Sequence, residues 1–460
     1  MRALDYKVQN INIQVDSIIS ELFKIDIHML SDEVSYTMVN GWDSFGHIQL
    51  ILKLEEAFGL TIKDNQVECL TSVGKIKNFI KDRTFGEGKK EPVQKGEQIF
   101  RGLIDVNYDF TNISEIKGGE GKLYYRGYDI ETLVGRLSFE ETSFLILKGH
   151  IPSRKELTEY TEKLKVYRSI PKDVVDIIYK LRNSHPLEML RTVVSFLSTV
   201  NGNRGLESTL EHGIKLISQI PIIVATFNSL RKSKDYLEPH NEYSHLQNFY
   251  YMLKGSLPTN KTLDFMERTF IIQAEHGSNA STFGARVVTS TGSDIYAAVT
   301  GAISAFSGHL HGGAAEKVVD MIKEIGDLES VSSYITNLLN KNQPIMGYGH
   351  RVYKTQDPRA KIFEEIMDKS FPYIKETKDY KILTSIADEM TKFAAHGIDK
   401  NVDFYMGLMY SVLNLPKDLL GLLFVSSRIV GWVSHVIEQK ERNILIRPSL
   451  KYTDVTNMDI

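Results

Sequence analysis

The stretch "DIYAAVTGAISAFSGHLHGGAAEKVVDMI", residues 294–322, holds two helix-like segments joined by a junction of glycine and histidine. Apolar residues recur at helical spacing on both sides of the junction. The glycines let the backbone turn sharply and approach a ligand closely. The stretch therefore predicts two consecutive helices, with His311 in the loop just ahead of the second, where side chains are often placed for catalysis.

Most of the chain beyond residue 99 repeats this helical pattern. Alternating stretches are few, and "KLYYRGYDI", residues 122–130, is the best candidate for an extended or hairpin segment. We therefore expect an all-α fold in which many helices pack in layers. The helix-like segments are "FEETSFLILKG", "KDVVDIIYKLRN", "LEMLRTVVSFLSTV", "DIYAAVTGAISAF", "AEKVVDMIKEI", "KIFEEIMDKSF", "YKILTSIADEMTKFAAH" and "LLGLLFVSSRIVGWVSHVIEQ".

The composition sets broad limits on the class of protein. The 460 residues suit two or three domains, and a formal net charge of −3 gives no general attraction to nucleic acid or anionic membranes. The single cysteine, Cys69, excludes an internal disulfide and a multi-cysteine metal site. The N-terminus lacks the apolar core of a signal peptide, and no apolar run approaches the roughly 18 residues of a membrane span. We expect a soluble, cytoplasmic protein with no nucleic-acid or membrane partner.

The first hundred residues divide into a helical block and a polar stretch. Residues 11–83 contain three segments with helical periodicity and predict a small bundle. "FGEGKKEPVQKGEQ", residues 85–98, has almost nothing to bury and is typical of a solvated linker, although an ordinary surface loop is the alternative. We expect domains at residues 1–84 and 99–460, joined by this linker.

Three groups of residues in the larger part could take part in catalysis or substrate binding. His311 precedes a helix, where the positive end of the dipole favours neutral imidazole, although a capping or packing role is the simpler alternative. His309 makes an H-x-H pair with it, but no carboxylate or cysteine stands nearby at ligand spacing, so we expect no metal. In "GYGHRVYKTQDPRA", residues 347–360, two glycines precede His350, Arg351, Lys354 and Arg359. Such a group of cations suits an anionic substrate, with a basic solvated loop as the alternative.

The third group is an aspartate with two arginines in apolar surroundings. Asp403 stands in "NVDFYMGLMYSV", where partial burial would raise its pKa toward that of a general base, with a buried helix cap as the alternative. Arg428 and Arg447 interrupt apolar stretches and need anionic partners, either protein carboxylates or a substrate. Together the histidines, the aspartate and the arginines fit proton abstraction beside a carbonyl, on a substrate with more than one carboxylate.

The order and length of these motifs resemble the citrate synthase family from about residue 100 to 450. The resemblance rests on "HPLEMLRTVVSFLS", residues 279–318, "GYGHRVYKTQDPRA", "NVDFY" and "SSRIVGWVSHVIEQ". It implies an all-α fold with a large and a small domain that close over the substrates. It also implies an obligate homodimer in which Arg447 reaches the partner subunit's site. The implied roles are Asp403 as base, His311 for the enol, His350 for the ketone oxygen of oxaloacetate, His276, Arg359 and Arg428 for its carboxylates, and Arg351 and Lys354 for coenzyme A.

Several positions depart from the pattern of that family. Gln273 and Gly277 flank His276, His309 and Ala315 flank His311, and Met406 follows Asp403. The chemical core is complete while its surroundings differ, which leaves the acyl donor and the hydrolysis step open.

Residues 11–83 resemble an acyl carrier protein. Asp43 and Ser44 open the amphipathic segment "GWDSFGHIQLILKLEEAFGLTI", which is similar to the attachment motif for 4′-phosphopantetheine, with Phe45 where leucine is commoner. The alternative is that Ser44 or Asp43 only caps a helix. The resemblance implies a phosphopantetheinyl transferase as a partner, and other biosynthetic enzymes that the carrier could serve.

We therefore expect condensation of an acyl thioester, on coenzyme A or on Ser44, with oxaloacetate or a related 2-oxo acid in specialised biosynthesis. Tethering would raise the local concentration of the donor. One alternative is a conventional citrate or 2-methylcitrate synthase that uses free acyl-CoA and has a regulatory N-terminal domain. Another is a carrier or scaffold dimer without catalysis, against which the complete set His311, His350 and Asp403 argues.

Overall fold

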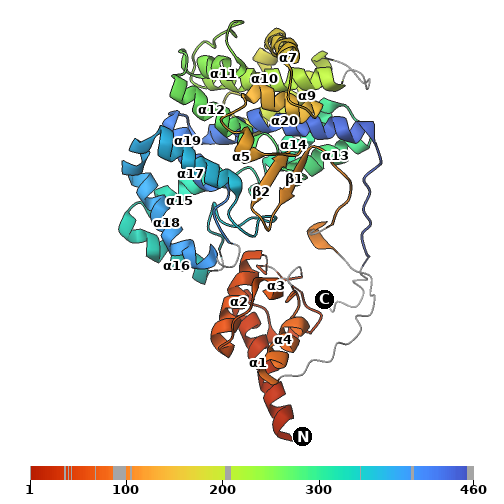
Figure 1. Ribbon diagram of the computed structural model, residues 1–460, viewed down its shortest axis with the longest axis vertical. Coiled ribbons are helices and arrows are strands. Elements are labelled where there is room, and N and C mark those ends of the chain that lie inside the picture. The colour runs from red at the N-terminus through yellow and green to blue at the C-terminus, as the bar shows by residue number, and fades with distance from the viewer. Residues whose placement is uncertain are drawn as a thin grey trace.

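A computed structural model describes residues 2–35, 38–39, 41–42, 44–67, 69–85, 100–103, 106–201, 209–341, 343–394 and 398–452. Almost all of its regular structure is helical, and the N-terminal bundle lies below the larger body in Figure 1. The expected helical class is therefore confirmed, with one small sheet that the prediction placed only in part.

Four helices form the N-terminal bundle: α1 (Arg2–Phe23), α2 (Ser44–Phe58), the short α3 (Asp64–Val67) and α4 (Val73–Phe85). Apolar side chains spaced along α1, α2 and α4 meet in its core, and Ile19, Ile51 and Ile76 are fully buried there. Trp42 lies in the turn before α2, stacks on Phe23 with ring centroids 5.1 Å apart and is buried. The three predicted segments are thus helices, and they share one core.

The polar stretch at residues 85–98 lies outside the described residues, apart from Phe85, which ends α4. The domain boundaries there remain a prediction. Across the gap, Gln49 of α2 donates a hydrogen bond of 3.3 Å to the carbonyl of Leu339, at the end of α16 (Val331–Asn340).

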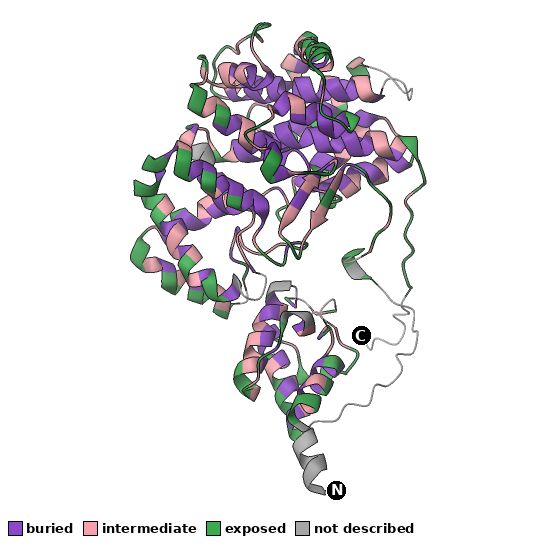
Figure 2. Cartoon of the chain, viewed as in Figure 1, coloured by how far each residue is buried: buried purple, intermediate pink, exposed green. Residues whose placement is uncertain are grey.

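The larger body is centred on α20 (Leu420–Glu441), which Figure 2 shows buried along most of its length. Helices from several parts of the chain pack around it because its apolar residues point in all directions. The helices of this body that contact α20 are α6 (Phe139–Lys148), α9 (Pro186–Asn201), α10 (Thr209–Leu230), α12 (Asn260–Gln273), α13 (Ala280–Ser290) and α14 (Ile295–Phe306). The same body also contains α5 (Ile130–Leu133), α7 (Arg154–Val166), α8 (Lys172–Lys180) and α11 (His245–Lys254).

Two of these helices correct an expectation from the sequence. By length and composition alone, α10 and the segment Lys417–Glu441 could cross a membrane, although no such run was expected. Within the fold, 83% of the most apolar 18-residue stretch of α10 is buried, and 94% of that of Lys417–Glu441. Their apolar character is therefore explained by packing in the centre of the helical body.

A second group of helices packs beside this body, on the left in Figure 1. It contains α15 (Ala314–Ile325), α16, α17 (Pro358–Ser370), α18 (Lys378–Ala394) and α19 (Val402–Val412). Helix α19 contacts α15 and α17, and α16 contacts α18. The predicted residues His311, His350 and Asp403 lie respectively in the turn between α14 and α15, in the loop between α16 and α17, and in the first turn of α19.

A small antiparallel sheet lies against the loop between α16 and α17. Its strands, in the order β1-β2-β3, are β1 (Ser114–Lys117), β2 (Lys122–Tyr125) and β3 (Tyr128–Asp129). Ser114 pairs with Tyr125, and Tyr125 pairs with Tyr128. The extended segment predicted at residues 122–130 is confirmed as β2 and β3, whereas β1 was not predicted.

Candidate active site

His350 is presented by a loop that pairs with the start of α19. Gly347 and Gly349 have φ values of +83° and +82°, which side chains other than glycine rarely adopt. Asn401 donates its backbone N–H to the Gly347 carbonyl at 2.9 Å and its side-chain N–H to the Gly349 carbonyl at 3.0 Å. These bonds bring the glycine loop and the first turn of α19, with Asp403, into one site.

The hydrogen bonds of His350 fix which of its nitrogens carries a proton. Its Nδ1 accepts the backbone N–H groups of Val352 and Tyr353, at 3.0 and 3.2 Å. Burial, and next the charge of Arg359, lower the pKa of His350 to about 4, so the ring is neutral near pH 7. Since Nδ1 is an acceptor, the single proton lies on Nε2, which is therefore a donor available to a substrate oxygen.

Arg359, the second residue of α17, is buried and paired with a carboxylate that the sequence analysis missed. Asp357 accepts from Arg359 Nε at 3.0 Å and from Nη2 at 2.7 Å. It also caps both adjacent helices, because it accepts the backbone N–H groups of Arg359 and Val402. The signal in the sequence was the Asp-Pro pair, with proline at the first position of a helix.

His276 lies in the loop that follows α12. Its Nε2 is 3.2 Å from the hydroxyl of Tyr353, and its ring centroid is 5.2 Å from that of His350. Burial, together with the charge of Arg359, holds the pKa of His276 well below its usual value. The hydroxyl of Tyr125 in β2 donates to the carbonyl of Glu275 at 2.9 Å, so the small sheet anchors the loop that carries His276.

Asp403 is the second residue of α19, and its backbone N–H is capped by the side chain of Asn401 at 3.0 Å. Desolvation is the largest influence on its carboxyl, and it raises the pKa to about 6 against the opposing charges of Arg359 and Arg428. A carboxylate with this pKa is ionised at neutral pH and basic enough to accept a proton from carbon.

Arg428 lies within α20 and is almost fully buried. Its Nε donates to the carbonyl of Gln273 at 2.6 Å, and its guanidinium lies 4.7 Å from the ring centroid of Phe424. Its buried Nη2 has no hydrogen-bond partner in the described part of the chain. A buried, unpaired guanidinium N–H is costly, which favours an anionic ligand at this position.

His311 occupies the turn between α14 and α15, as predicted. Gly312 is needed for a close approach there, because a Cβ at this position would lie 2.4 Å from the carbonyl oxygen of Phe306. Burial, and then the charge of Arg428, lower the pKa of His311 to about 4. Its Nε2 lies 2.9 Å from the hydroxyl of Ser281, a second partner that the sequence analysis missed.

Other predicted site residues stand apart from this cluster. Arg351 and Lys354 are exposed on the loop after His350. Arg447 is exposed in the extended segment after α20, and it has no contact with the cluster within the described part of the chain. That segment is held on α13 by a bond of 3.1 Å from Ile446 N–H to Ser290 Oγ.

The structure describes only part of the Asp43-Ser44 motif. Ser44 is the first residue of α2, and Asp43 lies outside the described residues.

Two of the departures from the family pattern contact each other. Gln273 and Met406 are both buried, and Gln273 Nε2 lies 3.3 Å from Met406 Sδ. Gly277 has a φ of +57°, so its substitution suits the turn beside His276. Gln273 also accepts the Nε bond of Arg428 through its carbonyl, so this pair lies beside a predicted site residue.

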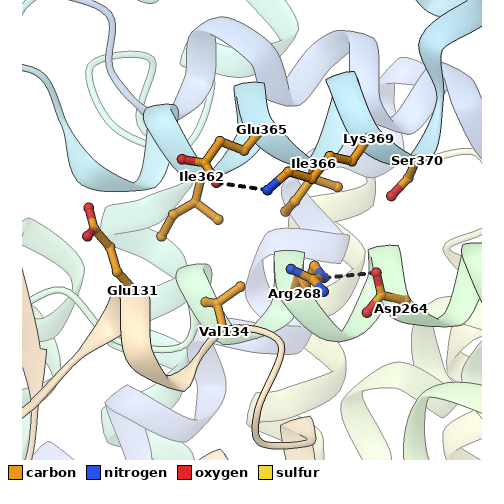
Figure 3. A pocket seen from close by; sticks show the side chains of 9 residues that line it. All are labelled: Glu131, Val134, Asp264, Arg268, Ile362, Glu365, Ile366, Lys369 and Ser370. Carbon is orange, nitrogen blue, oxygen red and sulfur yellow. Dashed lines mark hydrogen bonds and ion pairs between the residues drawn. The ribbon is translucent and has the colours of Figure 1, made fainter.

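One cavity is lined by none of these residues. It has a volume of about 330 Å³ and lies between α12 and α17, as Figure 3 shows. Its charged side chains pair with one another, as Arg268 does with Asp264 at 2.8 Å and Lys369 with Glu365 at 3.5 Å. The candidate site is therefore identified by the chemistry of its residues.

Comparisons with known proteins identify the family of the chain. The model of the citrate synthase C-terminal domain matches residues 102–449. Citrate synthase 2 of Bacillus subtilis is 38% identical, over 77% of this chain and 95% of its own length. The 2-methylcitrate synthase 2 of Corynebacterium glutamicum is 37% identical, over 77% of this chain and 94% of its own length.

Solved structures give the same result. The citrate synthase of Thermotoga maritima has a TM-score of 0.72 and 36% identity, covering 79% of this chain and 97% of its own. The enzyme of Thermoplasma acidophilum, solved with carboxymethyl coenzyme A and oxaloacetate, has a TM-score of 0.74 and 31% identity, covering 79% and 98%. The chain is a condensing enzyme that belongs to the citrate synthase family.

Proposed function

We propose that the chain condenses acetyl-CoA or propionyl-CoA with oxaloacetate, giving citrate or 2-methylcitrate and free coenzyme A. The observation that carries this proposal is the combination of Asp403, with a pKa of about 6, and two histidines whose pKa values of about 4 keep them neutral. The names of the relatives, citrate synthase and 2-methylcitrate synthase, support acyl-CoA donors. They favour this conventional activity over the carrier-bound condensation expected from the sequence.

In this proposal Asp403 removes a proton from the carbon beside the thioester carbonyl. His311 donates a hydrogen bond to the oxygen of the resulting enol, which limits the charge that develops there. His350 donates from Nε2 to the ketone oxygen of oxaloacetate and makes its carbon more electrophilic. A new carbon–carbon bond forms between the enol carbon and the ketone carbon, the C=O π bond breaks, and the ketone oxygen takes the proton of His350 Nε2 to become a hydroxyl. Water then hydrolyses the thioester, which leaves a carboxylate on the product and releases coenzyme A as its thiol.

The carboxylates of oxaloacetate bind to His276, Arg359 and Arg428. The unpaired Nη2 of Arg428 supports this assignment, because an anionic oxygen there would satisfy a buried donor. Arg351 and Lys354, exposed at the rim, are assigned to the phosphates of coenzyme A. Arg447 completes the site of the partner subunit in a homodimer.

The test is an assay of the purified chain with oxaloacetate and either acetyl-CoA or propionyl-CoA. Release of the coenzyme A thiol and the mass of the product identify the donor. We expect turnover with at least one donor and none with Asp403→Asn. If wild type and Asp403→Asn release coenzyme A at the same rate, the assignment of the base is wrong.

A second role concerns the N-terminal bundle, for which we propose that Ser44 carries 4′-phosphopantetheine. The supporting observation is that Ser44 begins α2 after a tightly held turn, since a Cβ on Gly46 would lie 2.1 Å from the Gly41 carbonyl oxygen. An attached thioester would then be presented at the end of a helix. The bundle would serve its own subunit, its dimer mate or another enzyme, and its transferase is a required partner.

Intact mass after incubation with coenzyme A and a phosphopantetheinyl transferase tests this second role. We expect the mass of one phosphopantetheine to be added to wild type and none to Ser44→Ala. An unchanged mass of wild type would reject the carrier role and leave the condensation proposal intact.

A further inference from the structure

The turn between β1 and β2, residues 118–121, packs against the loop that carries His350. Lys354 of that loop donates its backbone N–H to the carbonyl of Gly118 at 3.2 Å. A Cβ at Gly118 would overlap the carbonyl oxygen of Val352 and lie 2.9 Å from its carbonyl carbon. The two backbones are therefore in direct contact, and only glycine permits so close an approach.

A second glycine of the same turn touches the same loop. Gly121 has a φ of +62°, and a Cβ there would lie 2.8 Å from Thr355 Oγ1 and 3.0 Å from the carbonyl oxygen of Gln356. By contrast, a Cβ at Gly119, on the exposed tip of the turn, would meet nothing within 4 Å. The turn thus holds the loop at two points, one on each side of its tip.

The hairpin behind the turn is anchored to the loop that carries His276. Tyr125 of β2 is fully buried and donates its hydroxyl to the carbonyl of Glu275 at 2.9 Å. Ser114 of β1 donates to Glu275 Oε1 at 2.9 Å, and its Oγ accepts the backbone N–H of Gly277 at 3.2 Å. Because its other end is fixed in this way, the turn can hold the His350 loop in place.

The part of the loop that Gly118 holds also orients the imidazole of His350. The backbone N–H groups of Val352 and Tyr353 both point to His350 Nδ1, at 3.0 and 3.2 Å. They lie between the two contacts with Gly118, which are made by the Val352 carbonyl and the Lys354 N–H. The two donors occupy the lone pair of Nδ1, so the single proton of the neutral ring stays on Nε2.

We propose that Gly118 is a positioning residue for His350, because its backbone holds residues 352–354 so that their N–H groups keep the imidazole proton on Nε2. This inference rests on the role given to His350 under the proposed function. If the loop moved, Nδ1 would be free to take the proton, and Nε2 would then be an acceptor that repels the ketone oxygen. The small sheet thus contributes to polarising the ketone without touching the substrate, since a donor fixed in advance needs no reorganisation during the reaction.

The ketone stretching frequency of bound oxaloacetate reports this hydrogen bond directly, because a donor to the oxygen weakens the C=O bond. Infrared difference spectra of the full chain with unlabelled oxaloacetate and with oxaloacetate carrying carbon-13 at the ketone isolate the band, and no acyl donor is needed. We expect wild type to lower the frequency relative to oxaloacetate in water. In Gly118→Ala the Val352 carbonyl must move, so at least half of this lowering should be lost, and kcat should fall about tenfold. A merely structural defect would reduce the bound fraction or the melting temperature and leave the frequency of bound oxaloacetate unchanged.

Gly119→Ala is the matched control in the same turn. Its Cβ points into open space, so the ketone frequency and kcat should stay at their wild-type values. A second variant keeps the test decisive if Gly118→Ala folds poorly. One glycine inserted between Gly119 and Glu120 adds no side chain, and exposed loop tips tolerate insertions, but it releases the spacing between the two points of contact. The frequency should change in the same direction as in Gly118→Ala.

A wild-type ketone frequency in both Gly118→Ala and the insertion variant would overturn the inference, as would an equal change in Gly119→Ala. His350→Ala separates this inference from the proposed function. If His350→Ala loses the lowering while Gly118→Ala and the insertion variant keep it, only the role of Gly118 is wrong. If His350→Ala keeps the wild-type frequency, the role of His350 and the inference that depends on it both fail.

Discussion

Asp357 holds Arg359 through two charge-assisted hydrogen bonds, of 3.0 Å from Nε and 2.7 Å from Nη2. The same carboxylate accepts the backbone N–H of Val402 at 3.2 Å. One side chain therefore fixes the first turn of α17, which carries Arg359, relative to the first turn of α19, which carries Asp403.

Asp357→Asn should weaken oxaloacetate binding while α17 remains capped. The single oxygen of asparagine can cap α17 as aspartate does, but it cannot also accept the backbone N–H of Val402 or neutralise the charge of Arg359. We expect the KM for oxaloacetate to rise about tenfold, by the loss of roughly one charged hydrogen bond. Steady-state kinetics measure this change. Asp129→Asn, which alters the cap of α5 on the sheet, should leave KM at its wild-type value. Equal KM values in the two variants would show that Asp357 does not orient Arg359.

Asp403→Asn should abolish condensation and stabilise the fold at pH 8. The folded-state pKa of Asp403 is about 6, above the unfolded value of about 3.9, so its ionised form opposes folding. This penalty is fully present above about pH 6 and fades as the pH falls toward 3.9. We expect a gain on the order of 1 kcal/mol at pH 8 that shrinks toward pH 4.5, measured by thermal unfolding at both pH values. A variant less stable than wild type at pH 8 would mean that the carboxylate has a stabilising partner.

The rate of condensation should fall below pH 6. Free enzyme needs ionised Asp403 and neutral histidines, and His311 and His350 stay neutral down to their pKa values of about 4. A plot of log kcat/KM should therefore have a single limb of slope one below about pH 6, from Asp403 alone. Thiol release measured from pH 5 to 8 at constant ionic strength gives this profile. A rate that stays constant down to pH 5 would point to a different base.

Gly431→Ala should disturb the loop that carries His276. A Cβ at Gly431 would lie 2.2 Å from Glu275 Oε2 and 2.6 Å from the Ala274 carbonyl oxygen, so the loop must move away from α20. We expect a loss of roughly 1–3 kcal/mol in unfolding free energy and a higher KM for oxaloacetate. Chemical denaturation and kinetics measure the two effects.

Gly421→Ala is the matched control in the same helix. Its Cβ would meet Leu187 Cδ1 at 3.1 Å, the end of a side chain that can turn aside. Alanine is also the better helix former, so stability should change little or rise. Equal destabilisation by the two variants would show that the effect belongs to the helix and not to the loop beside His276.

The helices could be predicted from the sequence because their apolar residues repeat every three to four positions, as along α14 and α15. Strand β1 was missed because four residues, Ser114–Lys117, carry too little pattern to mark a strand. Helix α10 was missed as well, and Pro221 in its interior is ordinarily a helix breaker. The long apolar sequence of α10 could be explained only when the helices that pack around it were known.

The candidate catalytic groups could be proposed from the sequence because histidines at glycine turns and an aspartate in an apolar stretch are unusual. The residues that hydrogen-bond to these groups could not be predicted. Ser281, for example, contacts His311 across 30 residues of chain, and a serine in a helix is not unusual. Tyr125 similarly reaches the His276 loop across 150 residues. Hydrogen bonds between distant segments have no periodicity in the sequence, and they set the tautomers on which the chemistry depends.

Arg447 should act in the active site of the partner subunit. In this chain Arg447 is exposed and directly follows Ile446, whose N–H bonds to Ser290 of α13. No contact in the described part of the chain joins Arg447 to the site residues of its own subunit. We therefore predict that Arg447→Ala and Asp403→Asn are each inactive as homodimers, whereas a heterodimer of the two regains activity. One of its sites combines an intact Asp403 with an intact Arg447 from the other subunit, so about half of the wild-type kcat per dimer is expected, from one intact site in two. Coexpression with two affinity tags and an assay of the doubly selected dimer measure this. If Arg447 served its own subunit, the site with Asp403 would lack it, and the heterodimer would stay inactive.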